Sequence, residues 1–218
     1  MNWDEARVWL DAHVNLETGV GIPSGIDRRK HAPTLERIRS LLDLLGSPEL
    51  AFPAVHLTGT NGKTSAARMT SALLESTGLS TGSYTSPHLE RVNERIAWNG
   101  EPIDDLSLAE ALTRVGAVED FVTDRPSYFE ILTAAAFDWF SDVAVEVAVV
   151  EVGLGGTWDA TNVLDGTVAV VTNVSIDHAE YLGNTREEIA AEKAGIVKPG
   201  SRLVLGETDV ALLPATQA

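Results

Sequence analysis

Short apolar runs rich in Val and Ala alternate with amphipathic stretches along most of this chain. Five runs have the length and composition of β-strands, and they cover residues 54–58, 81–85, 143–152, 168–174 and 202–205. Strands that alternate with helices pair in parallel, because each intervening helix carries the chain back across the sheet. The pattern therefore predicts an α/β fold, a mostly parallel, doubly wound sheet with helices on both faces.

The helical stretches have recognisable ends. Apolar residues at helical spacing, preceded by Thr34 and followed by Gly46, predict a helix over 35–45. Three Ser/Thr-x-x-Glu sequences are typical of capping boxes, in which a hydroxyl and a carboxylate close the first turn of a helix. These sequences lie at 107–110, 127–130 and 185–188. They predict helices that begin there, the second ending near Ser141 and the third at Gly195.

The charge of the chain limits what it can bind. It has 16 Lys and Arg against 32 Asp and Glu, which gives a formal net charge of −16 and an isoelectric point near 4.6. Binding to nucleic acid or to an anionic membrane needs basic surface, so we expect no nucleic-acid partner and no membrane partner. Any anionic ligand must be held locally, by a single lysine, a helix N-terminus or a metal ion.

Other features of the composition point to a cytoplasmic protein. Cysteine is absent, which excludes disulfides, thiol nucleophiles and Cys-type zinc sites. The first five residues are acidic where a signal peptide would be basic, and no apolar run reaches the length of a membrane span. A length of 218 residues exceeds one average domain and falls short of two. We therefore expect a soluble, cytoplasmic globular protein.

A glycine-rich turn joins the first apolar run to a helical stretch over 63–77. The turn consists of Gly59, Thr60, Asn61, Gly62, Lys63, Thr64 and Ser65. Its glycines allow backbone N–H groups to approach phosphate oxygens, and the helix N-terminus adds partial positive charge. Lys63 would reach the β- and γ-phosphates, and the Thr64 hydroxyl would face a magnesium ion. The turn is a shorter variant of the strict phosphate-loop pattern, which has Gly where this chain has Leu57.

An acidic residue lies at the end of the third apolar run. Ligands of doubly wound sheets bind at the carboxyl ends of the strands, and Glu151 lies at such an end. Gly153, Gly155 and Gly156 leave its surroundings open. In a phosphate-loop enzyme, an acid at this place holds magnesium directly or through water. Glu146, earlier in the same run, is expected to be an ordinary exposed side chain.

Five further residues have structural explanations at least as good as functional ones. His178 follows the fourth apolar run, where a lone histidine is usually structural. Ser86 follows the second run, where a plain turn fits equally well. Lys193 lies in the last turn of a predicted helix, where the dipole stabilises a cation by about 0.3–1 kcal/mol. Phe129 and Glu130 are explained by helix packing and by the capping box.

Taken together, these motifs and their order closely resemble the folylpolyglutamate synthase and dihydrofolate synthase family, a branch of the Mur ligase superfamily. The matching segments are 56–64, 85–88, 93–96, 127–130, 151–156, 159–163, 172–174, 177–178 and 192–196. The resemblance implies a truncated ATP-binding central domain of Mur ligase type over 1–218, with a helical segment at 1–50 packed on it. It also implies that the C-terminal ligase domain is absent.

Members of this family use ATP to add L-glutamate to the carboxylate of a pteroate or folate through an acyl phosphate. The resemblance implies that this chain is such an ADP-forming amide ligase, with dihydropteroate or a reduced folate as acceptor and Mg²⁺ as cofactor. Family members are roughly twice as long, so activity is expected to need a C-terminal domain, for example on a separate partner chain. The alternative is a non-catalytic ATP- or pterin-binding module. A ligase of cell-wall precursors is a third, less favoured interpretation.

The resemblance also implies roles for single residues. Besides ATP binding by the loop 59–65, it implies that the catalytic residues are Lys63, His178 and Lys193. The magnesium ligands would be Ser86, Glu151, His178 and Lys193. Lys193 would be carbamylated, which turns a cation into a carboxylate-like ligand suited to magnesium. The acceptor site would be lined by Ser86, Pro87, His88, Phe129, Glu130, Gly155, Gly156 and Asp159.

Two positions depart from the usual sequence of that family. Many relatives have Gly where this chain has Thr64, so the hydroxyl that faces the metal is either that of Thr64 or that of Ser65. Relatives commonly have Arg where this chain has Thr157, so we expect one cationic contact to be missing.

Overall fold

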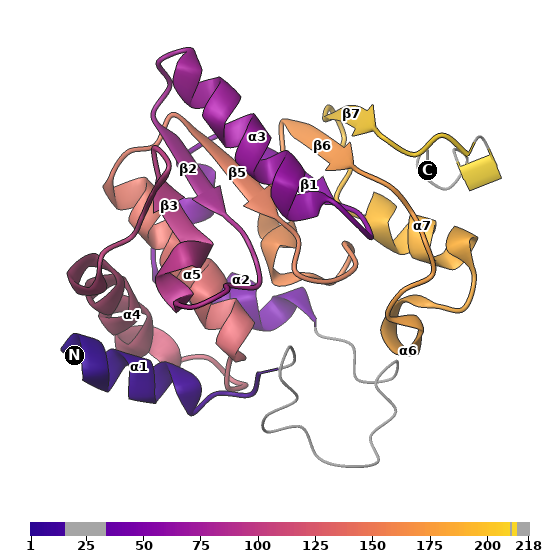
Figure 1. Cartoon of the computed structure of the whole chain (residues 1–218). Coiled ribbons are helices and arrows are strands. Elements are labelled where there is room, and N and C mark those ends of the chain that lie inside the picture. The colour runs from indigo at the N-terminus through magenta and orange to yellow at the C-terminus, as the bar shows by residue number, and fades with distance from the viewer. Residues whose placement is uncertain (16–33, 210, 213–218) are drawn as a thin grey trace.

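The computed structural model describes residues 1–15, 34–209 and 211–212. At its centre is a seven-stranded sheet with the order β4-β3-β2-β5-β1-β6-β7 (Figure 1). The strands are β1 Ala54–Thr58, β2 Thr81–Tyr84, β3 Ile96–Trp98, β4 Glu101–Pro102, β5 Val147–Glu151, β6 Val168–Val171 and β7 Arg202–Leu205. Five of them, β2, β5, β1, β6 and β7, pair in parallel, while β3 and β4 add an antiparallel edge. The predicted mostly parallel sheet is confirmed.

The register of the sheet places three strand ends side by side. The central strand β1 pairs with β5 through Leu57 and Glu151, and with β6 through Thr58 and Val171. Because these strands are parallel, the segments that leave them emerge at the same edge of the sheet. The phosphate loop, Glu151 and the segment after β6 therefore meet there.

Helices cover both faces of the sheet, as predicted. Helix α3, Lys63–Ser76, packs Ala67 against Leu57 and Val149 on one face. Helices α5, Tyr128–Asp142, and α7, Arg186–Ala194, lie on the other face. Burial on both sides accounts for the Val- and Ala-rich strands, because polar side chains would be desolvated on either face.

The remaining helices surround this core. They are α1 Trp3–Asp11, α2 Leu35–Leu44, α4 Asp105–Glu119, the short α6 Ala179–Leu182, and the 3-10 turns η1 Pro48–Leu50, η2 Val92–Arg95 and η3 Ala160–Val163. Helices α1, α2 and α4 share one hydrophobic core with α5. Residues 16–33 of the expected N-terminal segment lie outside the described residues. Among the helices that the structure describes, none is long and apolar enough to cross a membrane.

The start of α4 corrects one sequence prediction. The sequence Ser107–Glu110 predicts that Ser107 caps the helix, but Asp104 does so, by accepting a hydrogen bond from the Ser107 N–H at 2.9 Å. Both side chains have the required oxygen three residues before a helical position, so the local pattern alone does not separate them. The other two capping boxes, at Ser127 and Thr185, are confirmed.

Two predicted strands are shorter than their apolar runs. Residues 143–146 form a turn after α5, in which Ala144 has a φ of 53°, and β5 begins only at Val147. Residues 172–174 leave the sheet after β6. The hairpin β3–β4 was not predicted, although its Asn99-Gly100 turn, with both φ angles positive, is a recognised hairpin signal.

Candidate functional site

The loop between β1 and α3 has the conformation that a phosphate-binding turn requires. Gly59 has a φ of 151° and Gly62, which caps α3, has a φ of 79°. A side chain at Gly59 would collide with the Thr172 side chain, so only glycine fits there. The Lys63 ammonium folds back across the loop and donates to the Gly59 carbonyl at 3.1 Å. The first turn of α3 and the one lysine of the loop thus lie together.

The segment that leaves β6 holds this loop in place. The Thr60 N–H donates to the Asn173 backbone carbonyl at 3.0 Å, and the Asn61 N–H donates to the Asn173 side chain at 3.1 Å. In return, the Asn173 amide and the Thr172 hydroxyl donate to the Asn61 carbonyl at 2.9 and 2.7 Å. These contacts join residues more than a hundred positions apart, so the spacing of the motif does not reveal them.

Glu151 connects the loop to the end of β2. Its side chain is buried and accepts from the Thr64 hydroxyl at 2.9 Å and from the Ser86 N–H at 3.3 Å. Burial raises the pKa of the Glu151 carboxyl, and the hydrogen bonds and the nearby Lys63 partly oppose this. Ser65 is exposed, whereas the Thr64 hydroxyl touches the carboxylate. The geometry therefore favours Thr64 as the hydroxyl that faces a metal.

The donors at this edge suit magnesium chemically, because hydroxyl and carboxylate oxygens are the ligands that a hard cation prefers. Within the described residues, no cluster of three His, Asp or Glu side chains forms a ready-made metal site. The predicted ligands contain only two residues of those types, Glu151 and His178. His178 lies before α6 with a φ of 47°, and its side chain is about half exposed. A metal at this place would depend on hydroxyls, on Lys193 in modified form and on the bound phosphates.

Lys193 is buried in the last turn of α7, where its side chain is only 3% exposed. Burial, followed by repulsion from Lys63, lowers the pKa of Lys193 to about 8, while Asp177, Glu192 and Asp159 act in the opposite direction. A Cβ on Gly156 would collide with the backbone of Glu192 and Lys193. The absence of a side chain there lets the loop after β5 pack directly on α7.

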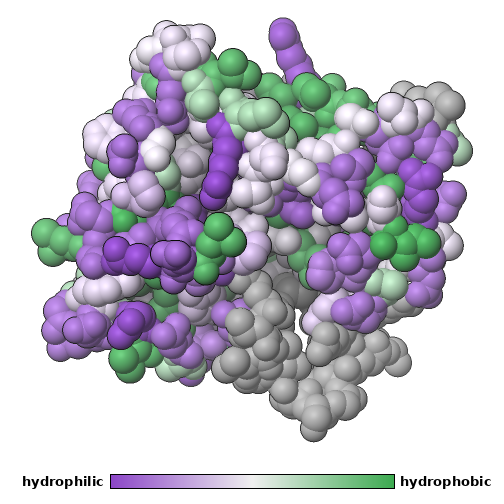
Figure 2. Space-filling model, in the orientation of Figure 1, coloured by the Kyte–Doolittle hydropathy of each residue, from purple (hydrophilic) through white to green (hydrophobic). Residues whose placement is uncertain are grey.

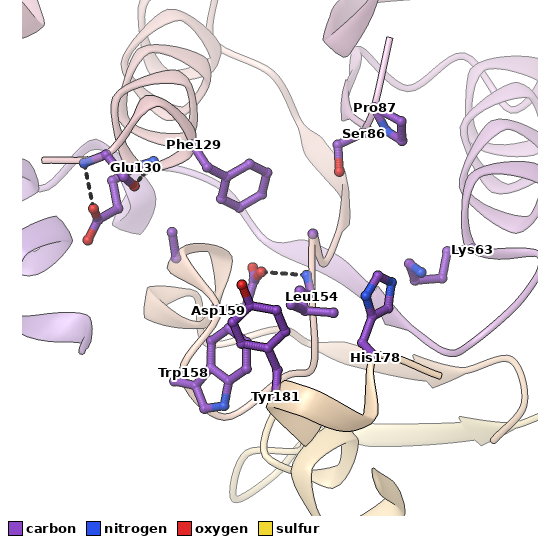
Figure 3. A pocket seen from close by; sticks show the side chains of 13 residues that line it. Lys63, Ser86, Pro87, Phe129, Glu130, Leu154, Trp158, Asp159, His178 and Tyr181 are labelled. Carbon is purple, nitrogen blue, oxygen red and sulfur yellow. Dashed lines mark hydrogen bonds between the residues drawn. The ribbon is translucent and has the colours of Figure 1, made fainter. Parts of the chain in front are cut away.

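A cavity of about 380 Å³ opens beside the loop (Figure 3). It is lined by Lys63, Ser86, Pro87, Ser127, Phe129, Glu130, Gly153, Leu154, Trp158, Asp159, Ala160, His178 and Tyr181. Figure 3 shows Lys63, Ser86 and His178 at one end, and Phe129, Trp158 and Tyr181 around Asp159 at the other. The pocket therefore joins a cationic, polar end to an aromatic end that contains one carboxylate.

The structure brings seven of the predicted site residues to the lining of this cavity, namely Lys63, Ser86, Pro87, Phe129, Glu130, Asp159 and His178, and the others lie outside it. His88 lies outside the lining and accepts from the Arg95 guanidinium at 2.9 Å. Glu130 reaches the wall, but its carboxylate turns away from Phe129, accepting from the Ser127 N–H and pairing with Arg37 at 3.1 Å (Figure 3). Glu130 thus caps α5. Glu151, Gly155, Gly156 and Lys193 are not among the lining residues.

Sequence reasoning predicted Phe129 but missed the other two aromatic residues of the cavity, Trp158 and Tyr181. Trp158 follows the glycine-rich segment after β5, and Tyr181 lies on the short helix α6. An aromatic residue within a glycine-rich loop is a usable signal, because such a loop does not itself bury a large ring. Tyr181 offered no such signal, since its position follows from where α6 packs.

Comparison with known proteins gives consistent results. The Mur ligase middle domain family matches residues 57–211. The chain is similar to the dihydrofolate synthase/folylpolyglutamate synthases of Mycobacterium tuberculosis, with 47% identity over 76% of this chain and 36% of that protein, and of Bacillus subtilis, with 38% identity over 94% and 46%. The chain spans less than half the length of these two relatives.

Solved structures agree with this. The M. tuberculosis folylpolyglutamate synthase complexed with ADP and AMPPCP has a TM-score of 0.79 and 43% identity, over 86% of this chain and 46% of its own. An FPGS–AMPPCP–folate complex has a TM-score of 0.86 and 38% identity, over 99% of this chain and 51% of its own. At these identities the likeness extends beyond the fold to the sequence.

Proposed function

Because this chain belongs to the Mur ligase middle domain family, we propose that it is the ATP-binding part of an ADP-forming ligase that joins L-glutamate to dihydropteroate or a reduced folate. The observation that carries the proposal is that one cavity is lined both by Lys63 of the phosphate loop and by an aromatic wall containing Asp159. A nucleotide phosphate and a flat heterocycle with a carboxylate tail would meet in such a cavity. The relatives' names, and the FPGS solved with AMPPCP and folate, support this assignment.

The phosphate loop would bind and orient ATP. Its N–H groups and the N-terminus of α3 would surround the phosphates, and Lys63 would exchange its bond to the Gly59 carbonyl for a phosphate oxygen. The acceptor carboxylate and the γ-phosphate are both anions. Positively charged groups that the fold already holds in place lower the barrier to phosphoryl transfer, because they offset the repulsion as the carboxylate approaches the γ-phosphate.

Magnesium, when bound, would neutralise phosphate charge and stabilise the charge that develops in phosphoryl transfer. The chain's own ligands for it would be Glu151, Ser86, His178 and carbamylated Lys193, with Thr64 beside Glu151. Because the pKa of Lys193 is lowered to about 8, a useful fraction of its amine is neutral at moderately alkaline pH. The neutral amine is the form that adds carbon dioxide to give a carbamate.

The other end of the cavity would hold the acceptor. A flat apolar surface for a ring system is provided by Phe129, Trp158 and Tyr181. Asp159 would accept hydrogen bonds from the N–H groups of that ring system. This would direct the acceptor's carboxylate towards Lys63 and His178. Closing the site and binding glutamate would fall to a C-terminal domain, in cis or on a separate chain. We propose that the protein functions in the cytoplasm.

A nucleotide-binding measurement tests the first part of the proposal. ADP binding with Mg²⁺ is measured by calorimetry for the wild type, for Lys63→Met, and for Arg202→Met as a control. Arg202 is the first residue of the parallel strand β7, so it lies at the amino ends of the strands, away from the carboxyl ends where the loop lies. Its substitution also removes one positive charge. We expect Lys63→Met to weaken binding at least tenfold and Arg202→Met to have little effect. Equal effects would indicate general electrostatics instead of a phosphate loop.

The role of Glu151 is tested by the magnesium dependence of the same affinity. We expect Mg²⁺ to tighten ADP binding to the wild type and to have a much smaller effect on Glu151→Gln, which lacks the buried anion. Glu146→Gln, just before the same strand, serves as the matched control and should keep the full response. A Glu151→Gln protein with an unchanged magnesium response would contradict the assignment.

Turnover decides between the ligase and the binding module. ADP release is followed with dihydropteroate and L-glutamate, with and without the C-terminal domain of a homologous synthase supplied as a second chain. Release that depends on both substrates supports the ligase. Binding of ADP and dihydropteroate without release under any of these conditions supports a binding module. Failure to bind either ligand would contradict both.

A further inference from the structure

A chain of hydrogen bonds runs from strand β1 to the wall of the cavity. The His56 ring is fully buried, and its Nε2 lies 2.8 Å from the Thr161 hydroxyl oxygen. The Thr161 hydroxyl donates to Asp159 Oδ1 at 2.5 Å, and the Thr161 N–H donates to the same oxygen at 2.9 Å. Asp159 Oδ2 accepts from the Leu154 N–H at 2.9 Å, as Figure 3 shows. His56 is therefore connected to Asp159 through one hydroxyl.

In this series of hydrogen bonds, every donor is directed towards Asp159. Two backbone N–H groups bind its carboxylate, and these can only donate. The single hydroxyl proton of Thr161 is used by Asp159, so the Thr161 oxygen must receive a proton from His56 Nε2. The arrangement thus requires a neutral His56 ring with its hydrogen on Nε2.

The surroundings of His56 agree with that form. Burial, followed by repulsion from Lys198, lowers the pKa of His56 to about 3. Its Nδ1 is a buried nitrogen with no hydrogen-bond partner among the described residues. An unpaired buried polar atom costs stability, and an aliphatic residue at this strand position would avoid the cost. Packing in β1 therefore does not explain the histidine.

One hydroxyl and the backbone N–H groups of Leu154, Thr161 and Gly153 favour the charged form of Asp159. Its side chain is almost fully buried, and burial raises its pKa, while the Thr161 hydroxyl is the strongest influence in the opposite direction. Lys193 on α7 is the cation that interacts with Asp159, and Lys198 is the one that interacts with His56. Among the groups that favour the ionised form of Asp159, the Thr161 hydroxyl is therefore the strongest.

We propose that His56 is a positioning residue: by fixing the Thr161 hydroxyl, it holds Asp159 as an ionised, correctly oriented acceptor in the wall of the cavity. The ligand class is a planar heterocycle with N–H donors, so this inference rests on the proposed function for its biological meaning. His56 touches neither the cavity nor the phosphate loop, yet it sets the affinity of the aromatic end. Strand β1, which leads into the phosphate loop, would thus also stabilise the wall of the cavity that contains Asp159.

The inference is tested first without any ligand. The pKa of Asp159 is measured by carbon-13 NMR titration, with Asp159→Asn used to assign the signal. We expect Thr161→Val, which replaces the hydroxyl with a methyl group, to raise this pKa by about one unit, because a hydrogen bond to the ionised form is lost. Thr161→Ser should restore it. His56→Leu should raise it, and His56→Gln, which keeps an N–H donor, should raise it less.

Thr81→Val is the matched control for this titration. Thr81 is equally buried at the start of β2, and its hydroxyl bonds to the Leu79 carbonyl. The substitution should leave the pKa of Asp159 unchanged. Nitrogen-15 NMR of the wild type should show His56 neutral with its hydrogen on Nε2 throughout pH 5–8, a result that does not depend on the folding of any variant. A hydrogen on Nδ1, or an Asp159 pKa unaffected by Thr161→Val and His56→Leu, overturns the inference.

Ligand binding then separates this inference from the proposed function. We expect Thr161→Val and His56→Leu to weaken dihydropteroate binding about tenfold at neutral pH while ADP binding stays unchanged. Loss of both ligands together would indicate a merely structural role and overturn the inference. If the pKa shifts occur as expected and the wild type binds no dihydropteroate, the positioning role is supported and the proposed substrate is wrong.

Discussion

Lys193 is buried at the end of α7, although a lysine in the last turn of a helix can usually extend into water. Sequence reasoning from the residues gave it only a favourable interaction with the helix dipole. The structure adds neighbours from distant segments, with Lys63 repelling it and Asp159 and Asp177 attracting it. The unusual chemistry of Lys193 thus comes from its place in the fold.

The lowered pKa of Lys193 makes a prediction about stability. Between about 8 and the ordinary value of 10.5, the unfolded chain binds more protons than the folded protein. The free energy of unfolding therefore gains a contribution that rises with pH across this window, and below it the buried charge reduces stability. We expect Lys193→Met to be more stable than the wild type in urea at pH 7, with the difference shrinking towards pH 10. A difference that grows with pH would contradict the burial of the charged form.

Carbamylation of Lys193 gives a second, direct prediction. In carbon-13-labelled bicarbonate at pH 8, the wild type should show a carbamate NMR signal that is absent from Lys193→Met. Lys198→Met removes the other described lysine with a lowered pKa and should keep the signal. A signal that is lost in Lys198→Met and retained in Lys193→Met would show that Lys198 carries the carbamate, and would contradict the prediction for Lys193.

At the scale of secondary structure, the ends of elements were the hardest to predict. The sequence Ser107–Glu110 fits a capping box, yet the helix is capped three residues earlier, by Asp104, which accepts a hydrogen bond from the Ser107 N–H. Similarly, the apolar run before Val147 continues the strand pattern, but those residues form the turn from α5 into the sheet. In both cases the local sequence pattern is compatible with two different boundaries.

The cap assignment is testable by denaturation. Asp104→Ala should lower the free energy of unfolding by about 1 kcal/mol, the usual cost of losing a side-chain cap. Ser107→Ala, which keeps the Ser107 N–H and the Asp104 cap, should cost clearly less. Hydrogen bonds from Ser107 lower the pKa of Asp104, so its contribution is present at neutral pH and is lost as the pH falls through that lowered value. Equal costs for the two variants would favour the original capping-box prediction.

At the scale of the whole molecule, the net charge of −16 is distributed over the surface, whereas the groups that would bind anions are concentrated at one sheet edge. On the part of the face in Figure 2 that is not grey, hydrophilic residues are spread across the surface with hydrophobic ones between them. A large net charge of one sign makes the folded state repel itself more than the expanded chain does. A phosphate at the loop would therefore have to be held against this general repulsion by local groups, such as Lys63 and the N-terminus of α3.

Screening that repulsion should stabilise the protein. We expect the Tm to rise as NaCl increases from 20 to 200 mM, because the Debye length then falls from about 20 Å to below 8 Å. Differential scanning calorimetry at constant pH measures this. A variant with two exposed acidic residues reversed, Asp11→Lys and Glu101→Lys, should show a smaller rise, since it has less repulsion to screen. A Tm that falls with salt would show that attractive ion pairs dominate.

The sequence by itself determined the α/β class, the parallel core strands, the phosphate loop and the family resemblance. These features are encoded locally, in strand composition, helix periodicity and the glycines that one turn requires. The tertiary structure decided which residues share a cavity. Glu130 became paired with Arg37, Trp158 and Tyr181 became pocket walls, and His56 became linked to Asp159. Those contacts join segments far apart in the chain, so they arise only when the sheet register and helix packing bring the segments together.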